Sequence, residues 1–243
     1  MTSTAAGSAT ARVLVTGGSG ASGIAVARAL ASAGHAVGAV GSDAARIRAA
    51  AAKAGDGVIP FVCDLAVLDN VRKLRDDVGA ALGPVDAVIH LVGGWRGAKG
   101  IADQSDEDWE FLERGAVTTL RNVSRVFFDD IAASTSGRFA MVSSTALEKP
   151  AAAVASYVAA KAAAEAWTMA MADGFRRASE AGGGEAAATV LVVKALVDDE
   201  LRRAHPERKF PGATDVADLA AAVVRLFGTP STELNGARLR LAD

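Results

Sequence analysis

Short, continuously apolar runs alternate along the chain with longer segments whose apolar residues recur at helical spacing. A run such as "RVLVT" at 12–16 offers apolar side chains to both faces, which is typical of a parallel strand covered by helices on both sides. Because parallel strands need crossover connections, the alternation predicts a doubly wound α/β fold with a mostly parallel seven-stranded sheet. Strands are expected at 12–16, 36–40, 58–62, 86–92, 137–143, 187–193 and 237–241, and helices at 20–33, 43–54, 67–82, 105–133, 153–180 and 215–227.

One domain of residues 12–243 accommodates this pattern, since 51% of the 243 residues are hydrophobic and no linker or repeat divides them. Residues 1–11 are small and polar and are expected to form a flexible leader. They lack the basic start and apolar core of a signal peptide. Residues 194–212 are charged and end in Pro-Gly, which predicts a mobile lid over a substrate, with a solvated loop as the alternative.

Composition also limits the partners. The net charge is -2 with both signs mixed, which argues against nucleic acid or an anionic membrane as the main partner. No apolar run approaches the roughly 20 residues of a membrane span. A single cysteine, Cys63, permits no internal disulfide and favours a cytoplasmic protein. We expect no metal site, because no His, Cys and acidic residues cluster at ligand spacing.

The stretch "TGGSGASG" at 16–23 follows the first expected strand and opens the first expected helix. Glycines at this position allow a tight turn and a close approach of the backbone to a pyrophosphate, which the helix N-terminus attracts. The pattern predicts a dinucleotide-binding turn, although a turn without a ligand would have the same spacing. The residues expected to contact the dinucleotide here are Gly17, Ser19, Gly20, Ala21 and Gly23.

The end of the second expected strand bears on the choice between NAD and NADP. Asp43 has the spacing of an acid that binds the ribose hydroxyls and favours NAD, but it would serve equally as the N-cap of the next helix. Gly41 and Ser42 leave room for a 2′-phosphate, with Arg46 in reach. We expect NAD(P), with a slight preference for NADP, and contacts from Ser42 and Asp43.

Five motifs occur in the order found in one family. They are "TGGSGASG" at 16–23, "CDL" at 63–65, "LVGG" at 91–94, "VSS" at 142–144 and "YVAAK" at 157–161. In these motifs the chain resembles the short-chain dehydrogenase/reductase family over nearly its whole length. The resemblance implies a Rossmann fold and an NAD(P)-dependent oxidoreductase that moves a hydride between nicotinamide and a carbonyl or alcohol. It also implies a homodimer or homotetramer joined through helices 105–133 and 153–180.

The same resemblance assigns individual residues. The family's tyrosine and lysine correspond to Tyr157 and Lys161, and its serine, thirteen residues before the tyrosine, to Ser144, with Ser143 as the neighbouring alternative. These three are the predicted catalytic residues. The cofactor contacts implied beyond the glycine turn are Asp64, Leu65, Gly93, Tyr157 and Lys161.

Physical chemistry explains why such a set could work. A phenol can give a proton to a developing alkoxide, but its ordinary pKa is about 10. On a helix Lys161 lies one turn from Tyr157, and a nearby ammonium would lower the pKa of the phenol. The Ser144 hydroxyl could orient the substrate oxygen. Without the other motifs, a Tyr and Lys at this spacing would more simply be residues at the edge of the core, with the lysine extending into solvent.

The chain departs from the family at several positions. It has Ala21 in place of a common glycine, "HLVG" at 90–93 in place of "NNAG", and Ala195-Leu196 in place of "PG". The asparagine of the usual proton relay would fall near Ala116 and is missing, and Asn122 is a weak substitute. These departures keep open a nucleotide-binding sensor or scaffold with little turnover.

Two further residues bear on the substrate. Gly93-Gly94-Trp95 resembles dihydropteridine reductases, which keeps open a pteridine or imine reductase on the same scaffold. Trp95 is expected either to contact the substrate or to pack. His90 ends an apolar strand and is expected to be a hydrogen-bonded core histidine rather than a catalytic one.

Overall fold

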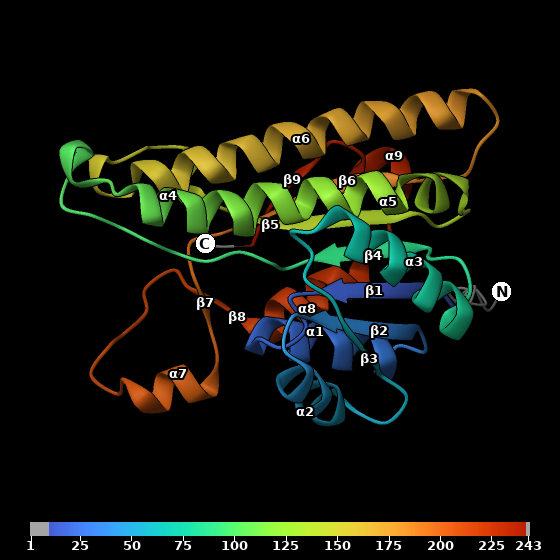
Figure 1. Ribbon diagram of the computed structural model, residues 1–243, viewed down its shortest axis with the longest axis horizontal. Coiled ribbons are helices and arrows are strands. Elements are labelled where there is room, and N and C mark those ends of the chain that lie inside the picture. The colour runs from blue at the N-terminus through green and yellow to red at the C-terminus, as the bar shows by residue number, and fades with distance from the viewer. Residues whose placement is uncertain (1–9, 242–243) are drawn as a thin grey trace, which may run out of the picture.

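The computed structural model describes residues 10–241, and its centre is one sheet of seven parallel strands (Figure 1). Their order across the sheet is β3-β2-β1-β4-β5-β6-β9, so the chain starts in the middle and winds outward in both directions. This arrangement confirms the predicted doubly wound Rossmann fold. The strands are β1 Arg12–Thr16, β2 Ala36–Gly41, β3 Ile59–Val62, β4 Ala87–His90, β5 Arg138–Ser144, β6 Ala187–Val193 and β9 Arg238–Arg240.

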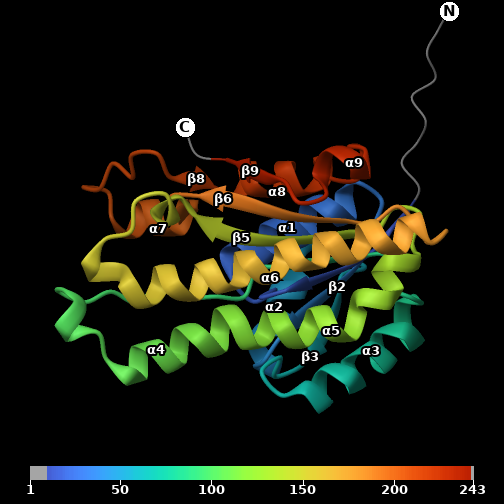
Figure 2. The same ribbon diagram turned by 90° about the horizontal axis from the view of Figure 1, so that it is seen from above.

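Helices cover both faces of the sheet (Figures 1 and 2). One face packs against α1 Ala21–Ser32, α2 Ala44–Ala54 and α8 Val216–Arg225. The other face packs against α3 Leu68–Leu82, α5 Thr119–Ala133 and α6 Ala155–Glu180. Figure 2 shows α5 and α6 running side by side across the second face.

The continuous apolar runs of the sequence follow directly from this double cover. Along β1, Val13 and Val15 pack toward α1, α2 and α8, whereas Leu14 between them packs toward α3, α5 and α6. All three side chains are fully buried. When both faces of a strand are buried, polar residues do not alternate with apolar ones along it.

The expected helix at 105–133 is divided into three parts. It begins as α4 Asp106–Glu113, continues as a short π-helix, η2 Arg114–Thr118, and ends as α5. Ser105 is the N-cap of α4, because its hydroxyl accepts a hydrogen bond from the Asp108 amide at 3.2 Å. Short π segments inside helices occur frequently at functional sites.

The expected lid segment lies beyond the carboxyl ends of the strands, at the left of Figure 1. It contains β7 Leu196–Val197 and α7 Asp199–Ala204, and β7 pairs in parallel with β8 Thr214–Asp215. After α8, the short helix α9 Ser231–Leu234 leads back to the last strand, β9. The segment at 194–212 is therefore partly ordered by secondary structure.

Of the expected leader, residues 1–9 lie outside the described residues. Ala11 is part of the packed domain, since it is 1% exposed and its amide donates to His35 Nδ1 at 3.2 Å. Among residues 10–241, no helix combines the length and the hydropathy needed to cross a membrane.

Candidate active site

Two adjoining cavities open at the carboxyl ends of the central strands. The first, of about 660 Å³, is lined by Tyr157, Lys161 and Ser143, and the second, of about 470 Å³, by the glycine turn and the ends of β2 and β3. They share a boundary formed by Ser22, Leu91, Val92 and Gly93. Open α/β sheets bind ligands at this edge, where the strand order reverses between β1 and β4.

Two of the turn glycines are required by packing. Gly17 has a φ of 75°, and a Cβ there would lie 2.8 Å from the carbonyl carbon of Leu91. A Cβ on Gly23 would clash with the carbonyl oxygen of Gly17. Gly20 is different, because a Cβ there would meet nothing closer than 3.7 Å. Its small size leaves open space at the start of α1, where a phosphate can approach the backbone.

Of the other turn residues, Ser19 lines the second cavity, whereas Ala21 and Gly23 do not. The Ser19 hydroxyl is buried without a hydrogen-bond partner among the residues that the structure describes. Ser19 lies directly beside Gly41, at which a Cβ would collide with its hydroxyl. The glycine at the end of β2 therefore creates the space that Ser19 occupies.

Asp43 is the N-cap of α2. Its Oδ1 accepts a hydrogen bond from the Arg46 amide at 2.7 Å, which is the helix-capping alternative considered from the sequence. The residues of this region that line the second cavity are Gly41, Ser42 and Arg46, and Asp43 does not. The expected dinucleotide contact from Asp43 thus lacks support from the cavity lining.

Asp64 and Leu65 both line the second cavity. Asp64 Oδ1 accepts from the Ala66 amide at 3.0 Å, and its Oδ2 pairs with Arg114 at 2.7 Å. Leu65 is 5% exposed, and its carbonyl accepts from Asn122 Nδ2 at 3.1 Å. Asn122 therefore binds the segment that follows β3, and this contact gives it a structural role distinct from the proton relay considered above.

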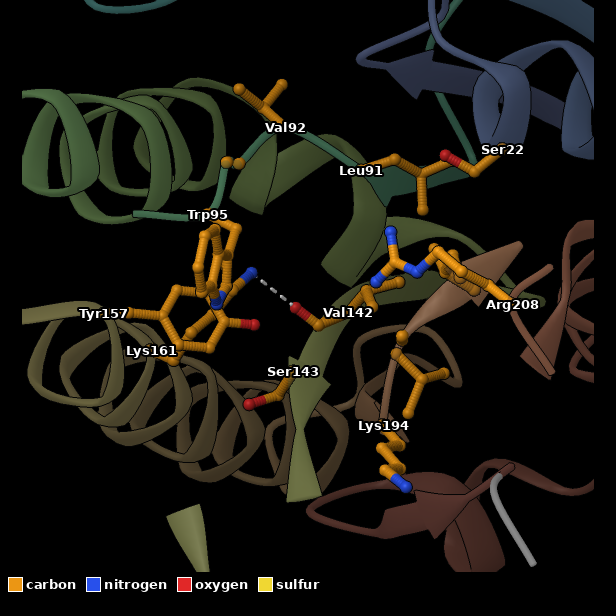
Figure 3. A pocket seen from close by; sticks show the side chains of 15 residues that line it. Ser22, Leu91, Val92, Trp95, Val142, Ser143, Tyr157, Lys161, Lys194 and Arg208 are labelled. Carbon is orange, nitrogen blue, oxygen red and sulfur yellow. Dashed lines mark hydrogen bonds between the residues drawn. The ribbon is translucent and has the colours of Figure 1, made fainter. Parts of the chain in front are cut away.

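Tyr157 lies near the start of α6 and faces the first cavity (Figure 3). Burial raises the pKa of its phenol, and a hydrogen bond with Ser144 partly opposes this rise. The net direction is the opposite of the one expected from Lys161. Ser144 is thus the serine that acts on the pKa of Tyr157, but its hydroxyl accepts from the Ala146 amide and it lines neither cavity. Ser143 lines the first cavity with a hydroxyl that lacks a partner within residues 10–241.

Lys161 is buried in the wall of the same cavity, at 8% exposure. Its Nζ donates to the Val142 carbonyl at 2.8 Å, the contact drawn in Figure 3. Burial lowers the pKa of its ammonium to about 8, and Glu165 one turn along α6 acts in the opposite direction. A Cβ on Gly93 would lie 3.3 Å from this Nζ, so the absence of a side chain at Gly93 leaves room for the ammonium.

His90 is the hydrogen-bonded core histidine that the sequence predicted. Its Nδ1 lies 2.8 Å from Thr16 Oγ1, and its Nε2 lies 3.2 Å from Thr119 Oγ1. Thr119 donates to the Gly115 carbonyl, so it accepts from Nε2–H, and Nδ1 accepts from Thr16. Burial, with Lys161 nearby, lowers the pKa of His90 to about 3, which keeps the imidazole neutral.

Several cavity residues had no individual assignment from the sequence. Leu91 and Val92 stand on the boundary between the cavities, and Arg208 reaches the first cavity from the expected lid. Trp95, which was expected either to contact a substrate or to pack, lines the same cavity and is 64% exposed. Leu91 and Val92 lie in the "LVGG" motif, which offered a signal, whereas no spacing rule could have placed Arg208 there.

Known proteins resemble this chain at two levels. Residues 11–179 match the short chain dehydrogenase family. Nodulation protein G of Rhizobium meliloti (strain 1021) is 30% identical over 135 residues, an alignment that covers 56% of this chain and 55% of that protein. The chain thus spans about half the length of this curated relative.

Solved structures resemble it over almost the whole chain. An NADPH-bound short chain oxidoreductase of Pseudomonas aeruginosa PAO1, described as containing an atypical catalytic center, superposes with a TM-score of 0.82, 20% identity and 95% coverage of both chains. NAD+-bound xylitol dehydrogenase gives 0.81 and 21%, with 96% of this chain and 97% of that chain covered. A short-chain type dehydrogenase/reductase from Mycobacterium ulcerans gives 0.83 and 19%, with coverages of 95% and 88%.

At these identities the structural likeness establishes the fold, and the family match rests on the sequence of residues 11–179. That match includes the glycine turn, the β5 serines and the α6 tyrosine and lysine. The chain therefore belongs to the short-chain dehydrogenase family.

Proposed function

We propose that the protein is an NAD(P)-dependent oxidoreductase that transfers a hydride between nicotinamide and a carbonyl or alcohol substrate. The main support is that Tyr157 and Lys161 line a cavity that adjoins the cavity at the glycine turn. A dinucleotide bound at this turn would extend from the second cavity toward the first. Structural relatives with NADPH and with NAD+ bound are consistent with this class of cofactor.

A bound nicotinamide would supply the hydride for the carbonyl carbon, and the carbonyl electron pair would pass to the oxygen. Tyr157 gives its phenolic proton to that oxygen, and the Ser144 hydroxyl orients it. Burial raises the pKa of Tyr157, so the phenol stays protonated at neutral pH but is a weaker proton donor than a free phenol. Carbonyl reduction, which uses the protonated phenol, should therefore proceed at neutral pH, whereas alcohol oxidation needs the phenolate and should rise at higher pH.

Lys161 holds a positive charge in the cavity wall through its bond to the Val142 carbonyl. With a pKa of about 8, it is mostly protonated at neutral pH and can exchange a proton near working pH. We infer that it also binds the nicotinamide ribose, as the family resemblance implies. Tyr157 and Lys161 thus have separate tasks, proton donation and cofactor positioning.

For the cofactor we propose a preference for NADP. Asp43 is used as a helix cap, while Ser42 and Arg46 line the cavity beside the end of β2. A 2′-phosphate there would meet a guanidinium and a hydroxyl. Separate titrations with NADPH and NADH test this, and Arg46→Gln should weaken NADPH binding about tenfold while leaving NADH binding unchanged. Tighter binding of NADH by the wild-type protein would refute the preference.

We also propose a homodimer or homotetramer in the cytoplasm that acts on a small molecule, without nucleic acid or membrane partners. The α5–α6 face carries an apolar hollow of about 430 Å³, whose lining includes Phe128, Trp167 and Met171. A second copy could cover this surface. Sedimentation of the purified protein measures the assembly directly, and a monomer at micromolar concentration would refute it.

Turnover is the deciding test of the function. Purified protein is given NADPH and a panel of carbonyl compounds, together with Tyr157→Phe, which should lower kcat by at least about a hundredfold. Ser144→Ala should lower kcat more than Ser143→Ala, because Ser144 is the serine that acts on the pKa of Tyr157. Full activity in Tyr157→Phe would refute the mechanism. Tight cofactor binding without any turnover would favour the alternative of a nucleotide-binding sensor or scaffold. Turnover of pterins or imines alone would favour a pteridine or imine reductase.

A further inference from the structure

The charged side chains that line the first cavity are all cations. They are Lys161, Lys194 and Arg208, and no carboxylate of the described chain joins them in the lining. The rest of the lining is apolar, backbone or hydroxyl. A cleft lined by one sign of charge raises the local concentration of ligands of the opposite sign.

Two of these cations already have partners. Lys161 donates to the Val142 carbonyl, and Lys194 donates to the Pro211 carbonyl at 2.7 Å. Figure 3 shows the Lys194 ammonium pointing away from the cavity, whereas the Arg208 guanidinium points toward its middle. Arg208 is thus the cation in the lining that is best placed to meet a bound molecule.

Other charged side chains near α7 are engaged in pairs. Arg202 lies 3.4 Å from Asp215, and His205 lies 3.6 Å from Glu207. No carboxylate within residues 10–241 lies at ion-pair distance from Arg208. Its guanidinium therefore keeps its hydrogen-bond donors free for an anion from outside the chain.

The backbone at Arg208 is fixed, and its exposed side chain lies beside one aromatic ring. The Arg208 amide donates to the His205 carbonyl at 3.0 Å, and the guanidinium carbon lies 5.2 Å from the centre of the Phe210 ring. Phe210 has a φ of 44°, the positive value found at a single non-glycine position of the described chain. This strained backbone sets the ring beside the guanidinium, which is thereby presented to the cavity.

The dinucleotide phosphates are a poor match for Arg208. They would bind at the glycine turn, where Gly17, Ser19 and Gly20 line the second cavity. Arg208 lines the first cavity, with Tyr157, and not the second. An anion at Arg208 therefore belongs to the molecule whose carbonyl lies at Tyr157.

We propose that Arg208 binds an anionic group of the substrate, which is a carbonyl compound that carries a carboxylate or a phosphate. This inference rests on the proposed oxidoreductase function. The planar guanidinium can hold two oxygens of such a group at once, and Leu91, Trp95 and Leu196 supply apolar walls for the carbon skeleton. Arg208 is accordingly a specificity-determining residue contributed by the lid.

Matched substrates test the proposal. Oxo acids and their methyl esters differ in charge at nearly constant shape, so the ratio of their kcat/KM values isolates the anionic group. We expect wild-type protein to prefer the acids by about tenfold to a hundredfold. Arg208→Gln should abolish this preference by slowing the acids alone, and Arg208→Lys should retain part of it. Lys209→Gln removes a charge from the next, exposed residue outside the cavity and should keep the full preference.

Three results would overturn the proposal. They are equal rates for acids and esters in the wild-type protein, an equal loss for both in Arg208→Gln, and weakened NADPH binding in Arg208→Gln with the acid preference intact. The last result would assign the guanidinium to the dinucleotide.

A binding experiment separates this inference from the proposed function. Calorimetry compares benzoate with benzamide on the protein saturated with NADP+, and needs no turnover. If no carbonyl is reduced, the proposed function fails, yet tighter benzoate binding that is lost in Arg208→Gln still supports an anion site at this residue. Equal or absent binding of the two ligands overturns the anion site, whatever the turnover.

Discussion

Replacing Lys161 by methionine should change how the stability of the protein depends on pH. Burial lowers the pKa of Lys161 from 10.5 to about 8, so the folded protein releases this proton at a lower pH than the unfolded chain does. Between pH 8 and 10.5 the unfolded chain binds more protons than the folded one. The free energy of unfolding therefore rises with pH across this window, and Lys161→Met lacks that rise.

The size of the effect follows from the two pKa values. Between pH 7.0 and 9.5 the difference in proton binding integrates to roughly 1.4 pH units, or about 2 kcal/mol at about 1.36 kcal/mol per unit. Relative to Lys161→Met, the wild-type protein should gain about 2 kcal/mol of stability over this interval. At pH 7.0 the buried ammonium is still charged, so little of the gain is present there.

Urea unfolding followed by tryptophan fluorescence at pH 7.0 and 9.5 measures the difference. Burial raises the pKa values of Tyr157 and Cys63, and these groups cost stability at high pH. Lys161 is not among the causes of either shift, so their contributions cancel between wild type and variant. Lys149→Met, at an exposed lysine, should follow the wild-type curve. Parallel pH dependences for wild type and Lys161→Met would refute the burial argument.

Three further predictions concern stability and cofactor binding. Since the pKa of His90 is lowered to about 3 from 6.5, the unfolded chain binds the extra proton in acid, and the wild-type protein should lose about 2.5 kcal/mol between pH 7 and 4.5. Acid titration of the unfolding free energy should show a flatter slope for His90→Asn, and an unchanged slope would contradict a neutral His90. Gly23→Ala should lower stability by about 1–3 kcal/mol and weaken NADPH binding at least about tenfold, because its Cβ would clash with Gly17. Gly79→Ala, inside α3 with open space at the Cβ position, should leave NADPH binding unchanged and slightly raise Tm, and weakened binding in that control would point to a general helix effect. Arg138 is 5% exposed and donates to four backbone carbonyls, so Arg138→Met should lower the unfolding free energy by about 3 kcal/mol, whereas a change below about 0.5 kcal/mol in urea unfolding would show that water replaces the guanidinium.

The sheet could be predicted because burial on both faces leaves a direct trace in the strand residues. The π-helix at 114–118 could not, since it changes the hydrogen-bond pattern of the backbone while the side chains keep a helical spacing. The end of β4 was also misplaced by two residues. Leu91 and Val92 are apolar like the strand before them, but they form the boundary of the two cavities rather than a paired strand.

In the site, sequence spacing brought Ser144, Tyr157 and Lys161 to one region, because a strand end and the following helix have little freedom relative to each other. The direction of the Tyr157 pKa was predicted wrongly. That direction depends on where the lysine head group lies, and the Lys161 Nζ is bound to the Val142 carbonyl. The position of Arg208 depends on the backbone path of the segment at 194–212, for which residue types carry no rule.

The two departures at His90 and Ala116 belong to one local arrangement. The neutral imidazole of His90 donates to Thr119, and Thr119 donates to the Gly115 carbonyl inside the π-helix. The next residue, Ala116, is buried in a small cluster with Ala160 and Tyr157. His90 thus binds the π-helix on the side that faces the sheet. The small side chain of Ala116 allows the π-helix to lie close to α6. The place of the usual asparagine is thus taken by a buried alanine that packs beside Tyr157.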